Sequence, residues 1–332
     1  MECCGREQKG VARIEKKEAF TLIEIDNLVK KYGDHVAVDH LSLTVEPGKI
    51  YGFLGPNGAG KSTTMNIITG YLGATSGTVT INGHDIFKEP EEAKKCVGYL
   101  PEIPPLYTDM TVLEYLNFVA ELKKLEKGLR KRYVEEAMET TGILDVKNRM
   151  IRNLSKGYRQ RVGFAQAILG YPEIIILDEP TVGLDPKQII EIRDLIRKLG
   201  EKHTVILSSH ILTEISAVCD HVFIISKGKL VASDSTENLL EQMSGAQEIE
   251  LIVRSESARA KELLEEIEYV EHVQIKDEQE GRILVRAKTG TDVRAEVFRQ
   301  MAENHIPVLE MHTVTKSLED VFLQITQEGG NQ

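Results

Sequence analysis

The chain has 332 residues, a formal net charge of −11, 41% hydrophobic residues and 28% charged residues. This length allows more than one domain, and the composition is that of an ordinary globular protein. The acidic balance disfavours nonspecific nucleic-acid binding, which needs clustered lysine and arginine. No apolar run approaches the roughly 20 residues of a membrane-spanning helix. We therefore expect no nucleic-acid partner, and a chain that does not itself form a membrane channel.

Residues 1–20 are polar and charged without periodicity, which predicts a disordered tail. The start lacks the apolar stretch of a secretory signal. The four cysteines, at positions 3, 4, 96 and 219, have neither a disulfide framework nor zinc-ligand spacing. A reducing cytoplasm fits this pattern, and lipidation of Cys3 or Cys4 is the alternative to a plain disordered start.

Strand-like segments begin at residue 21, in TLIEIDNLVKKYG and LSLTVEPGKIYGFLG. Directly after the second segment comes GPNGAGKST, which matches G-x-x-x-x-G-K-[ST] and precedes the helix-like TTMNIITGYL. Backbone N–H groups and a helix N-terminus in this context bind phosphate, Lys61 reaches the β- and γ-phosphates, and the Ser62 hydroxyl can bind Mg²⁺. The predicted nucleotide-binding residues are Gly55, Pro56, Asn57, Gly58, Ala59, Gly60, Lys61, Ser62 and Thr63.

Helical patterns follow. TVLEYLNFVAELKKL opens with Thr111 and Glu114 at capping-box spacing, and LRKRYVEEAMETTGI predicts a second helix. LSKGYRQR, residues 154–161, has the appearance of a second phosphate-binding helix start, about a hundred residues after the first.

Buried-strand runs return in EIIILDEP and HTVILSSH, with an amphipathic helix between them from Lys187 to Leu199. Alternating strands and helices predict a parallel sheet that is covered on both faces. Asp178 ends the first run and is placed to hold Mg²⁺, while Glu179 can accept the proton of an attacking water. Taken alone, this pair is explained equally well as a solvated acidic turn. His210 ends the second run and could donate a hydrogen bond to the γ-phosphate.

A strand pair with its turn at Lys227–Gly228, HVFIISKGKLVASD, closes this region. We expect a linker at residues 236–246. Residues 247–332 then show strands and helices in the order β-α-β-β-α-β, which predicts a small α+β ferredoxin-like accessory domain, followed by a short helix at SLEDVFLQITQ.

The motifs GPNGAGKST, LSKGYRQR, IIILDEPTVGLDP and SSH occur in the order and spacing of the ATP-binding cassette family, which the chain resembles over residues 21–235. The resemblance implies an α/β P-loop NTPase fold with a parallel-sheet core, an antiparallel β subdomain and a helical subdomain at about residues 103–160. Tyr32 matches the aromatic residue that stacks on adenine in the family. LSKGYRQR resembles the signature motif, which covers the γ-phosphate that a second subunit holds.

The resemblance therefore implies a head-to-tail homodimer around two ATP molecules with Mg²⁺, in which Ser155 and Gly157 contact the partner's nucleotide and Asp185 lies at the interface. Two departures stand out: Lys156 and Tyr158 replace the glycine and glutamine usual in the signature. Glu102 replaces the usual metal-contacting glutamine, and we assign it as a metal ligand.

The variant signature and the ending SLEDVFLQIT resemble subunits of exporters. We expect an ATP hydrolase on the inner face of a bacterial or archaeal membrane, with a separate integral-membrane permease. The alternative is a soluble family member that remodels nucleoprotein or ribosomes, although such chains usually carry two cassettes. A third possibility, a switch that binds ATP without turnover, is disfavoured by Glu179.

Overall fold

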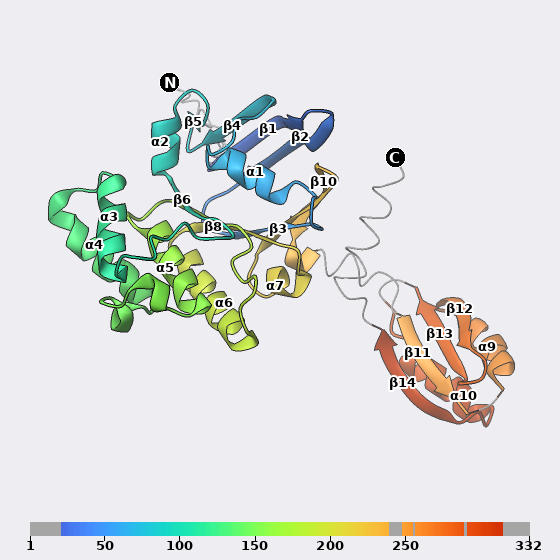
Figure 1. The fold of residues 1–332 in the computed structure, drawn as a ribbon. Helices are drawn as coiled ribbons and strands as arrows, with labels where there is room; N and C mark the ends of the chain where they lie inside the picture. The colour runs from blue at the N-terminus through green and yellow to red at the C-terminus, as the bar shows by residue number, and fades with distance from the viewer. Residues whose placement is uncertain (1–20, 239–247, 255, 289–290, 315–332) are drawn as a thin grey trace, which may run out of the picture.

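The computed structural model describes residues 21–238, 248–254, 256–288 and 291–314 (Figure 1). The expected tail at residues 1–20, most of the expected linker and the helix expected at SLEDVFLQITQ lie outside the described residues. Residues 21–238 are called the N-terminal unit below, and the described residues from 248 to 314 the C-terminal unit. Within the described part of the chain, no helix combines the length and the apolar character needed to cross a membrane.

A six-stranded sheet forms the centre of the N-terminal unit, in the order β10-β9-β3-β8-β7-β6. All neighbours are parallel except β10, which turns back through Lys227–Gly228 and pairs antiparallel with β9, as expected. Strands β3, β7 and β8 are buried along their whole length, as parallel strands covered on both faces are. The strands are β3 (Ile50–Leu54), β6 (Val97–Leu100), β7 (Ile174–Leu177), β8 (Thr204–Ser209), β9 (His221–Ser226) and β10 (Lys229–Ser235).

An antiparallel sheet in the order β2-β1-β4-β5 lies on one side of this central sheet, with α1 between the two (Figure 1). One apolar core joins all three layers and includes Ile23 of β1, Met65 of α1 and Phe53 of β3, each fully buried. The elements are β1 (Ile23–Tyr32), β2 (His35–Val45), α1 (Lys61–Ile68), β4 (Ser76–Ile81), β5 (His84–Asp85) and α2 (Pro90–Lys95).

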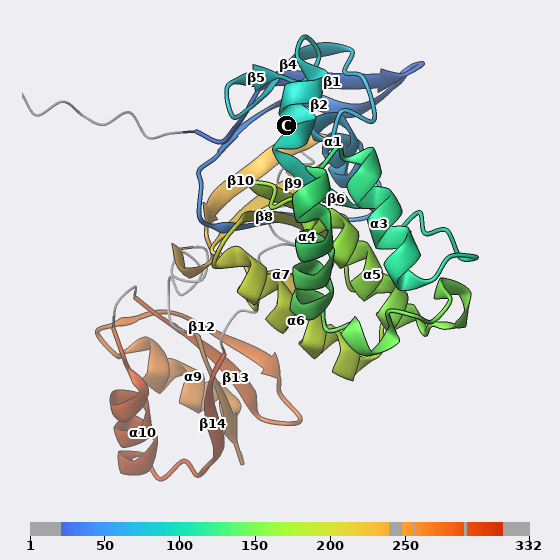
Figure 2. The same ribbon diagram turned by 90° about the vertical axis from the view of Figure 1, so that its left-hand side faces the viewer.

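Three helices that follow β6 pack on one another: α3 (Val112–Leu122), α4 (Lys127–Thr141) and α5 (Lys156–Ile168) (Figure 2). The capping box predicted at the start of α3 is present. The Glu114 N–H donates to Thr111 Oγ1 over 3.3 Å, and the Thr111 N–H donates to Glu114 Oε2 over 2.8 Å. Two short 3₁₀ turns, Leu144–Val146 and Ile151–Asn153, connect α4 to α5. Because α5 continues to Ile168 and also packs on β6, it joins the helical region to the central sheet.

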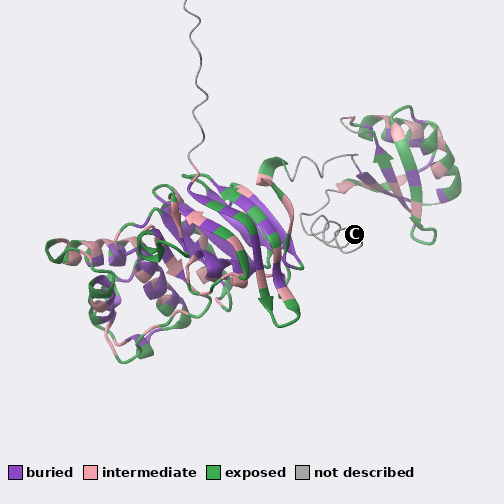
Figure 3. Ribbon diagram, turned by 90° about the horizontal axis from the view of Figure 1, so that it is seen from above, coloured by how far each residue is buried: buried purple, intermediate pink, exposed green. Residues whose placement is uncertain are grey.

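Helices α6 (Pro186–Gly200) and α7 (Leu212–Ser216) bury apolar residues in the core that also contains α3, α4, α5 and the strands β7 and β8. The helix expected at Lys187–Leu199 is thus confirmed with one more residue at each end. Figure 3 shows buried residues running along the strands of the sheets. Both faces of the central sheet are therefore covered, and the carboxyl ends of its parallel strands are left to form a site.

The C-terminal unit has its own apolar core, which includes Leu251, Leu264 and Val285, all fully buried. Its sheet is antiparallel with the order β12-β13-β11-β14, and its chain order β-α-β-β-α-β is the predicted one. That order and connectivity are those of a ferredoxin-like fold. The elements are β11 (Glu248–Val253), α9 (Ser257–Glu265), β12 (Val270–Asp277), β13 (Arg282–Ala287), α10 (Arg294–Glu303) and β14 (Val308–Val314).

Candidate functional site: a nucleotide pocket at the carboxyl ends of the parallel strands

The loop between β3 and α1 holds two glycines in the left-handed backbone region, Gly58 at φ 80° and Gly60 at φ 103°. Gly60 is also the N-cap of α1. A Cβ atom on Gly60 would lie 2.4 Å from the carbonyl oxygen of Ala37 on β2. Glycine is required there by both the conformation and the close approach of another backbone. The loop therefore directs backbone N–H groups and the N-terminus of α1 into one space, an arrangement that attracts phosphate.

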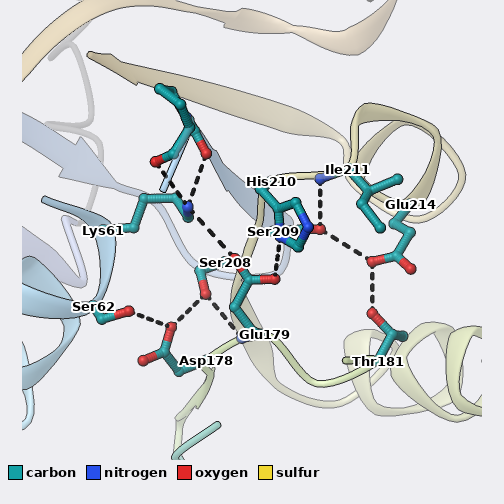
Figure 4. A network of polar contacts seen from close by, with 12 residues as sticks. Lys61, Ser62, Asp178, Glu179, Thr181, Ser208, Ser209, His210, Ile211 and Glu214 are labelled. Atoms are coloured by element: carbon teal, nitrogen blue, oxygen red, sulfur yellow. Dashed lines mark hydrogen bonds and ion pairs between the residues drawn. The ribbon is translucent and has the colours of Figure 1, made fainter. Parts of the chain in front are cut away.

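Lys61, the first residue of α1, is buried, and its ammonium group is held inside the loop. Its Nζ donates to the Gly55 carbonyl oxygen over 2.8 Å and lies 3.4 Å from Oε1 of Glu179. The cation is thus fixed between the phosphate loop and the end of β7 (Figure 4). A phosphate group that enters the loop would find this charge already in place.

Asp178 and Glu179 follow the last residue of β7, and both are buried. Oδ1 of Asp178 accepts hydrogen bonds from the hydroxyls of Ser208, over 2.5 Å, and Ser62, over 3.2 Å. The backbone N–H of Glu179 donates to the same Ser208 hydroxyl over 2.9 Å. Ser208 on β8 therefore fixes both acidic residues at the edge of the sheet, as Figure 4 shows.

The donor set around Asp178 suits Mg²⁺, which prefers oxygen ligands and is bound in such enzymes by one or two carboxylates together with phosphate. The Ser62 hydroxyl and the Asp178 carboxylate already lie 3.2 Å apart, and Glu102 lines the same pocket. On β6, the Tyr99 hydroxyl donates to Asn66 Oδ1 over 3.1 Å. Burial, with the Asp178 carboxylate as a smaller cause, raises the pKa of Tyr99 well above its ordinary value. This hydroxyl therefore stays protonated beside the acidic residues.

His210 lies directly after β8, and its Nδ1 is 3.0 Å from Oε2 of Glu179. Glu179 has a φ of 45°, in the left-handed region that non-glycine residues seldom occupy. Its backbone conformation is held by the Ser208 hydrogen bond, and its carboxylate lies between Lys61 and His210. A carboxylate held in this way can accept a proton from a water that faces the pocket.

A cavity of about 410 Å³ lies at this end of the sheet. Its lining includes Tyr32, Glu102, Glu179 and His210 together with the loop residues from Asn57 to Thr63, so the structure brings these predicted site residues to one place. Tyr32 is 49% exposed at the end of β1, and the Lys30 ammonium lies over its ring, 5.2 Å from the ring centroid. Gly55 and Pro56 lie at the base of the loop, where their carbonyl oxygens accept from Lys61.

Ser155, Gly157 and Asp185 line a different cavity, of about 420 Å³, at the N-termini of α5 and α6. The Ser155 and Asp185 side chains cap these two helices, accepting from the N–H groups of Tyr158 and Gln188. A Cβ atom on Gly157 would lie 2.8–3.0 Å from the Gln188 amide group. Within one chain, the structure does not bring these three residues into the cavity of the phosphate loop.

The two departures in the signature segment have structural partners. Lys156 extends across the loop after β7. Its Nζ would lie only 2.1 Å from a Cβ atom placed on Gly183. The Tyr158 hydroxyl donates to Oδ2 of Asp145 over 3.3 Å, and its ring packs on the helical core. Tyr158 thus ties α5 to the connection between α4 and α5.

Four further polar side chains belong to this region and were not predicted from the sequence: the buried Ser208, Thr181, Gln160 and Glu214. Gln160 donates from Nε2 to the Pro180 carbonyl oxygen over 2.9 Å, which holds the segment after Glu179 against α5. Gln160 alone had a usable signal: a polar residue on the apolar face of a helix. Ser208, Thr181 and Glu214 have no such local signal, because their roles depend on loops that come together only in the fold.

A family model described as ABC transporter matches residues 38–182. The bacitracin transport ATP-binding protein BcrA of Bacillus licheniformis is 37% identical over 93% of this chain and 98% of that protein. The linearmycin resistance ATP-binding protein LnrL of Bacillus subtilis (strain 168) is 31% identical over 92% of this chain and 98% of that protein.

Solved structures give the same result for the fold. An ATP-binding subunit of an ABC transporter has a TM-score of 0.61 and 29% identity, covering 67% of this chain and 93% of that one. The ADP conformation of MJ1267, an ATP-binding cassette of an ABC transporter, has a TM-score of 0.60 and 27% identity, covering 66% and 94%. These similarities show that the chain belongs to the ABC transporter family and is an ATP-binding, ATP-hydrolysing subunit.

Proposed function

We propose that two copies of this chain close head to tail around two ATP molecules with Mg²⁺, and that this cycle drives export through a separate membrane permease. One observation carries the proposal: two phosphate-attracting helix starts, at Lys61 and at Ser155, line different cavities of the same chain. The α5 start offers a hydroxyl, a glycine and a helix N-terminus, all suited to an anion. A second subunit would supply that anion.

In this proposal each residue has a separate task at the pocket. Ser62, Asp178 and Glu102 hold Mg²⁺, which neutralises phosphate charge when it is bound. Lys61 exchanges its contact with Glu179 for phosphate oxygens, and the freed Glu179 carboxylate takes the proton of the attacking water. His210 orients the γ-phosphate and stays hydrogen-bonded to Glu179. Tyr32 provides a face on which the adenine ring stacks.

The head-to-tail arrangement makes a prediction about mixed dimers. Lys61→Ala should inactivate the phosphate loop, and Gly157→Ala the signature segment, so neither variant should turn over ATP alone. In a head-to-tail dimer, each site combines the phosphate loop of one subunit with the signature segment of the other. A dimer of one Lys61→Ala and one Gly157→Ala subunit therefore has both defects in one site, and its other site is intact. Mixing the two variants should therefore restore ATP hydrolysis, measured as phosphate release. Should each site use residues of one chain only, the mixture would stay inactive.

Glu179→Gln offers an independent test, because it keeps the shape of the side chain and removes the proton acceptor. We expect this variant to bind ATP and accumulate as a dimer, visible by gel filtration with ATP and Mg²⁺. ADP should leave it monomeric, since it lacks the bridging phosphate. A monomer under both conditions would contradict the proposal.

The export role rests on the relatives, of which one is named for bacitracin transport and another for linearmycin resistance. We propose that this chain works in the same way, on the inner face of a bacterial or archaeal membrane. Affinity purification of the chain from detergent-solubilised membranes should recover a polytopic membrane protein at a fixed ratio. Recovery with ribosomes and no membrane protein would favour the soluble alternative.

A further inference from the structure

Glu214, the third residue of α7, has a carboxylate that is buried behind the nucleotide pocket. Its Oε2 accepts hydrogen bonds from two hydroxyls, Thr181 Oγ1 over 2.6 Å and Ser209 Oγ over 3.0 Å (Figure 4). Among the residues that the structure describes, no cation forms an ion pair with Glu214. A buried carboxylate without a cation is costly, and the two hydrogen bonds offset only part of that cost.

The two hydroxyls come from the two loops that carry the catalytic groups. Thr181 is two residues after Glu179, and Ser209 directly precedes His210. Since His210 Nδ1 contacts Glu179 Oε2 at 3.0 Å, the interactions close a ring. It runs from Glu179 along the chain to Thr181, across Glu214 to Ser209, and through His210 back to Glu179.

The ring is stiffened on both sides. Ser209 Oγ also accepts from the Ile211 N–H over 3.0 Å, which fixes the turn that carries His210 into α7. Leu184 N–H donates to the Thr181 carbonyl oxygen over 3.2 Å, which begins the path to Asp185. Among the residues that the structure describes, Glu214 is the one side chain that accepts hydroxyl hydrogen bonds from both loops, and it is not among the residues that line the nucleotide cavity.

We propose that Glu214 is a positioning residue for ATP hydrolysis, which holds the His210 loop and the Glu179–Asp185 loop in register by accepting one hydroxyl from each. It acts through hydrogen bonds to a single oxygen and not through its charge. Its contribution falls on the chemical step, because the groups that it aligns act on the attacking water and the γ-phosphate. The phosphate loop, which binds the nucleotide, is left unchanged.

Glu214→Ala tests the proposal by removing the acceptor. We expect kcat for ATP hydrolysis to fall by about 100-fold, the size of effect that a misplaced catalytic group produces, while KM changes less than about threefold. Glu214→Gln keeps an amide oxygen that can accept both hydroxyls, and should retain most of the parental kcat. Thr213→Ala, at an exposed position of the same helix, is the matched control.

Thr181→Val provides a second route if Glu214→Ala folds poorly, since it removes one donor and keeps the shape of the side chain. It should lower kcat, whereas Thr181→Ser should not. Three results would overturn the proposal: a parental kcat in both Glu214→Ala and Thr181→Val, a raised KM with unchanged kcat, or a Glu214→Gln variant as slow as Glu214→Ala. If Glu214→Gln were as slow as Glu214→Ala, the loss of kcat would come from removing the negative charge of Glu214 and not from removing a hydrogen-bond acceptor. Thermal unfolding of each variant separates loss of alignment from loss of the fold.

Discussion

Lys61 illustrates how single residues in the pocket are held ready for a ligand. Its ammonium contacts the Gly55 carbonyl oxygen and the Glu179 carboxylate, both of which it would exchange for phosphate oxygens. Charged groups that are buried and already oriented interact strongly with a ligand because little reorganisation is needed. The same burial makes the residue hard to replace.

We predict that Lys61→Ala abolishes ATP hydrolysis, because the loop loses its charge and the buried Glu179 loses a cation. The measurement is phosphate release at saturating ATP, with nucleotide binding followed separately. Lys261→Ala, which removes a lysine from α9 in the C-terminal unit, serves as the control and should hydrolyse ATP normally. Parental turnover in Lys61→Ala would exclude the assigned role.

Gly157 allows a test of the signature segment, because two different reasons could require glycine at this position. The side chain of Gly157→Ala would press against Gln188. In the proposed dimer, it would also stand where the phosphate of the second subunit approaches. We predict that Gly157→Ala keeps ATP binding but loses turnover, and that the double variant Gly157→Ala/Gln188→Ala remains inactive. Recovery of hydrolysis in the double variant would mean that glycine is needed only to make room for Gln188.

At the scale of residues, the sequence predicted those groups whose spacing follows from a local motif. The loop residues from Asn57 to Thr63, Glu179 and His210 line one cavity because strand ends of a parallel sheet meet at one edge, and Asp178 is hydrogen-bonded to Ser62 beside it. Glu214 could not be found in this way, since its partners come from two loops separated along the chain. Lys156 was noted as a departure from the signature, but its place beside Gly183 could not be predicted, because it depends on how two loops pack.

At the scale of elements, the signals at helix ends were the most informative. The capping box at Thr111 correctly placed the start of α3, and the amphipathic pattern from Lys187 to Leu199 placed α6 to within one residue at each end. The extent of α5 was not foreseen, because the signature motif draws attention to its first turn and its C-terminal half is defined by packing on β6. Tertiary contacts decide such boundaries.

The junction between α6 and β8 carries a pH-dependent contribution to stability. His203 lies there, buried, with its Nδ1 2.7 Å from the Pro172 carbonyl oxygen. Burial is the main cause that lowers the pKa of His203 below its ordinary value of 6.5. Between the folded pKa and about 6.5 the unfolded chain therefore binds more protons, so stability is lost as the pH falls through this range.

We predict that the unfolding temperature falls as the pH is lowered from 7.5 to about 5.5, and that His203→Asn reduces this pH dependence. Asparagine can donate to Pro172 but does not titrate, so the two proteins should differ least at pH 8. Thermal unfolding followed by circular dichroism at several pH values provides the measurement. An identical pH dependence in both proteins would show that His203 does not carry the effect.

At the scale of the whole molecule, the buried apolar residues that the structure describes fall into three cores, two in the N-terminal unit and one in the C-terminal unit. A region with its own core can fold by itself. The order of strands and helices predicted the ferredoxin-like unit from sequence, since alternation and helical periodicity are local properties. No local motif indicates the function of the C-terminal unit.

We predict that a truncated protein ending at residue 238 folds and binds ATP, because all residues that line the nucleotide cavity lie before that point. Residues 248–314 expressed alone should unfold cooperatively. Calorimetry of the full chain should show more than one transition, and the truncated protein should lack one of them. Failure of the truncated protein to bind nucleotide would place part of the binding surface after residue 238.

The seam between the two sheets of the N-terminal unit has a consequence for nucleotide choice. The Ala37 carbonyl group faces both Gly60 and Gly228, and the Gly228 N–H donates to the Ala59 carbonyl oxygen over 2.9 Å. These backbone contacts fix how far Tyr32, on the neighbouring strand, stands from Lys61. A flat ring accepts any base on its face. The site should therefore select nucleotides by the distance from the base to the terminal phosphate. Its affinity should fall more for nucleotides with fewer phosphates than for other purine triphosphates.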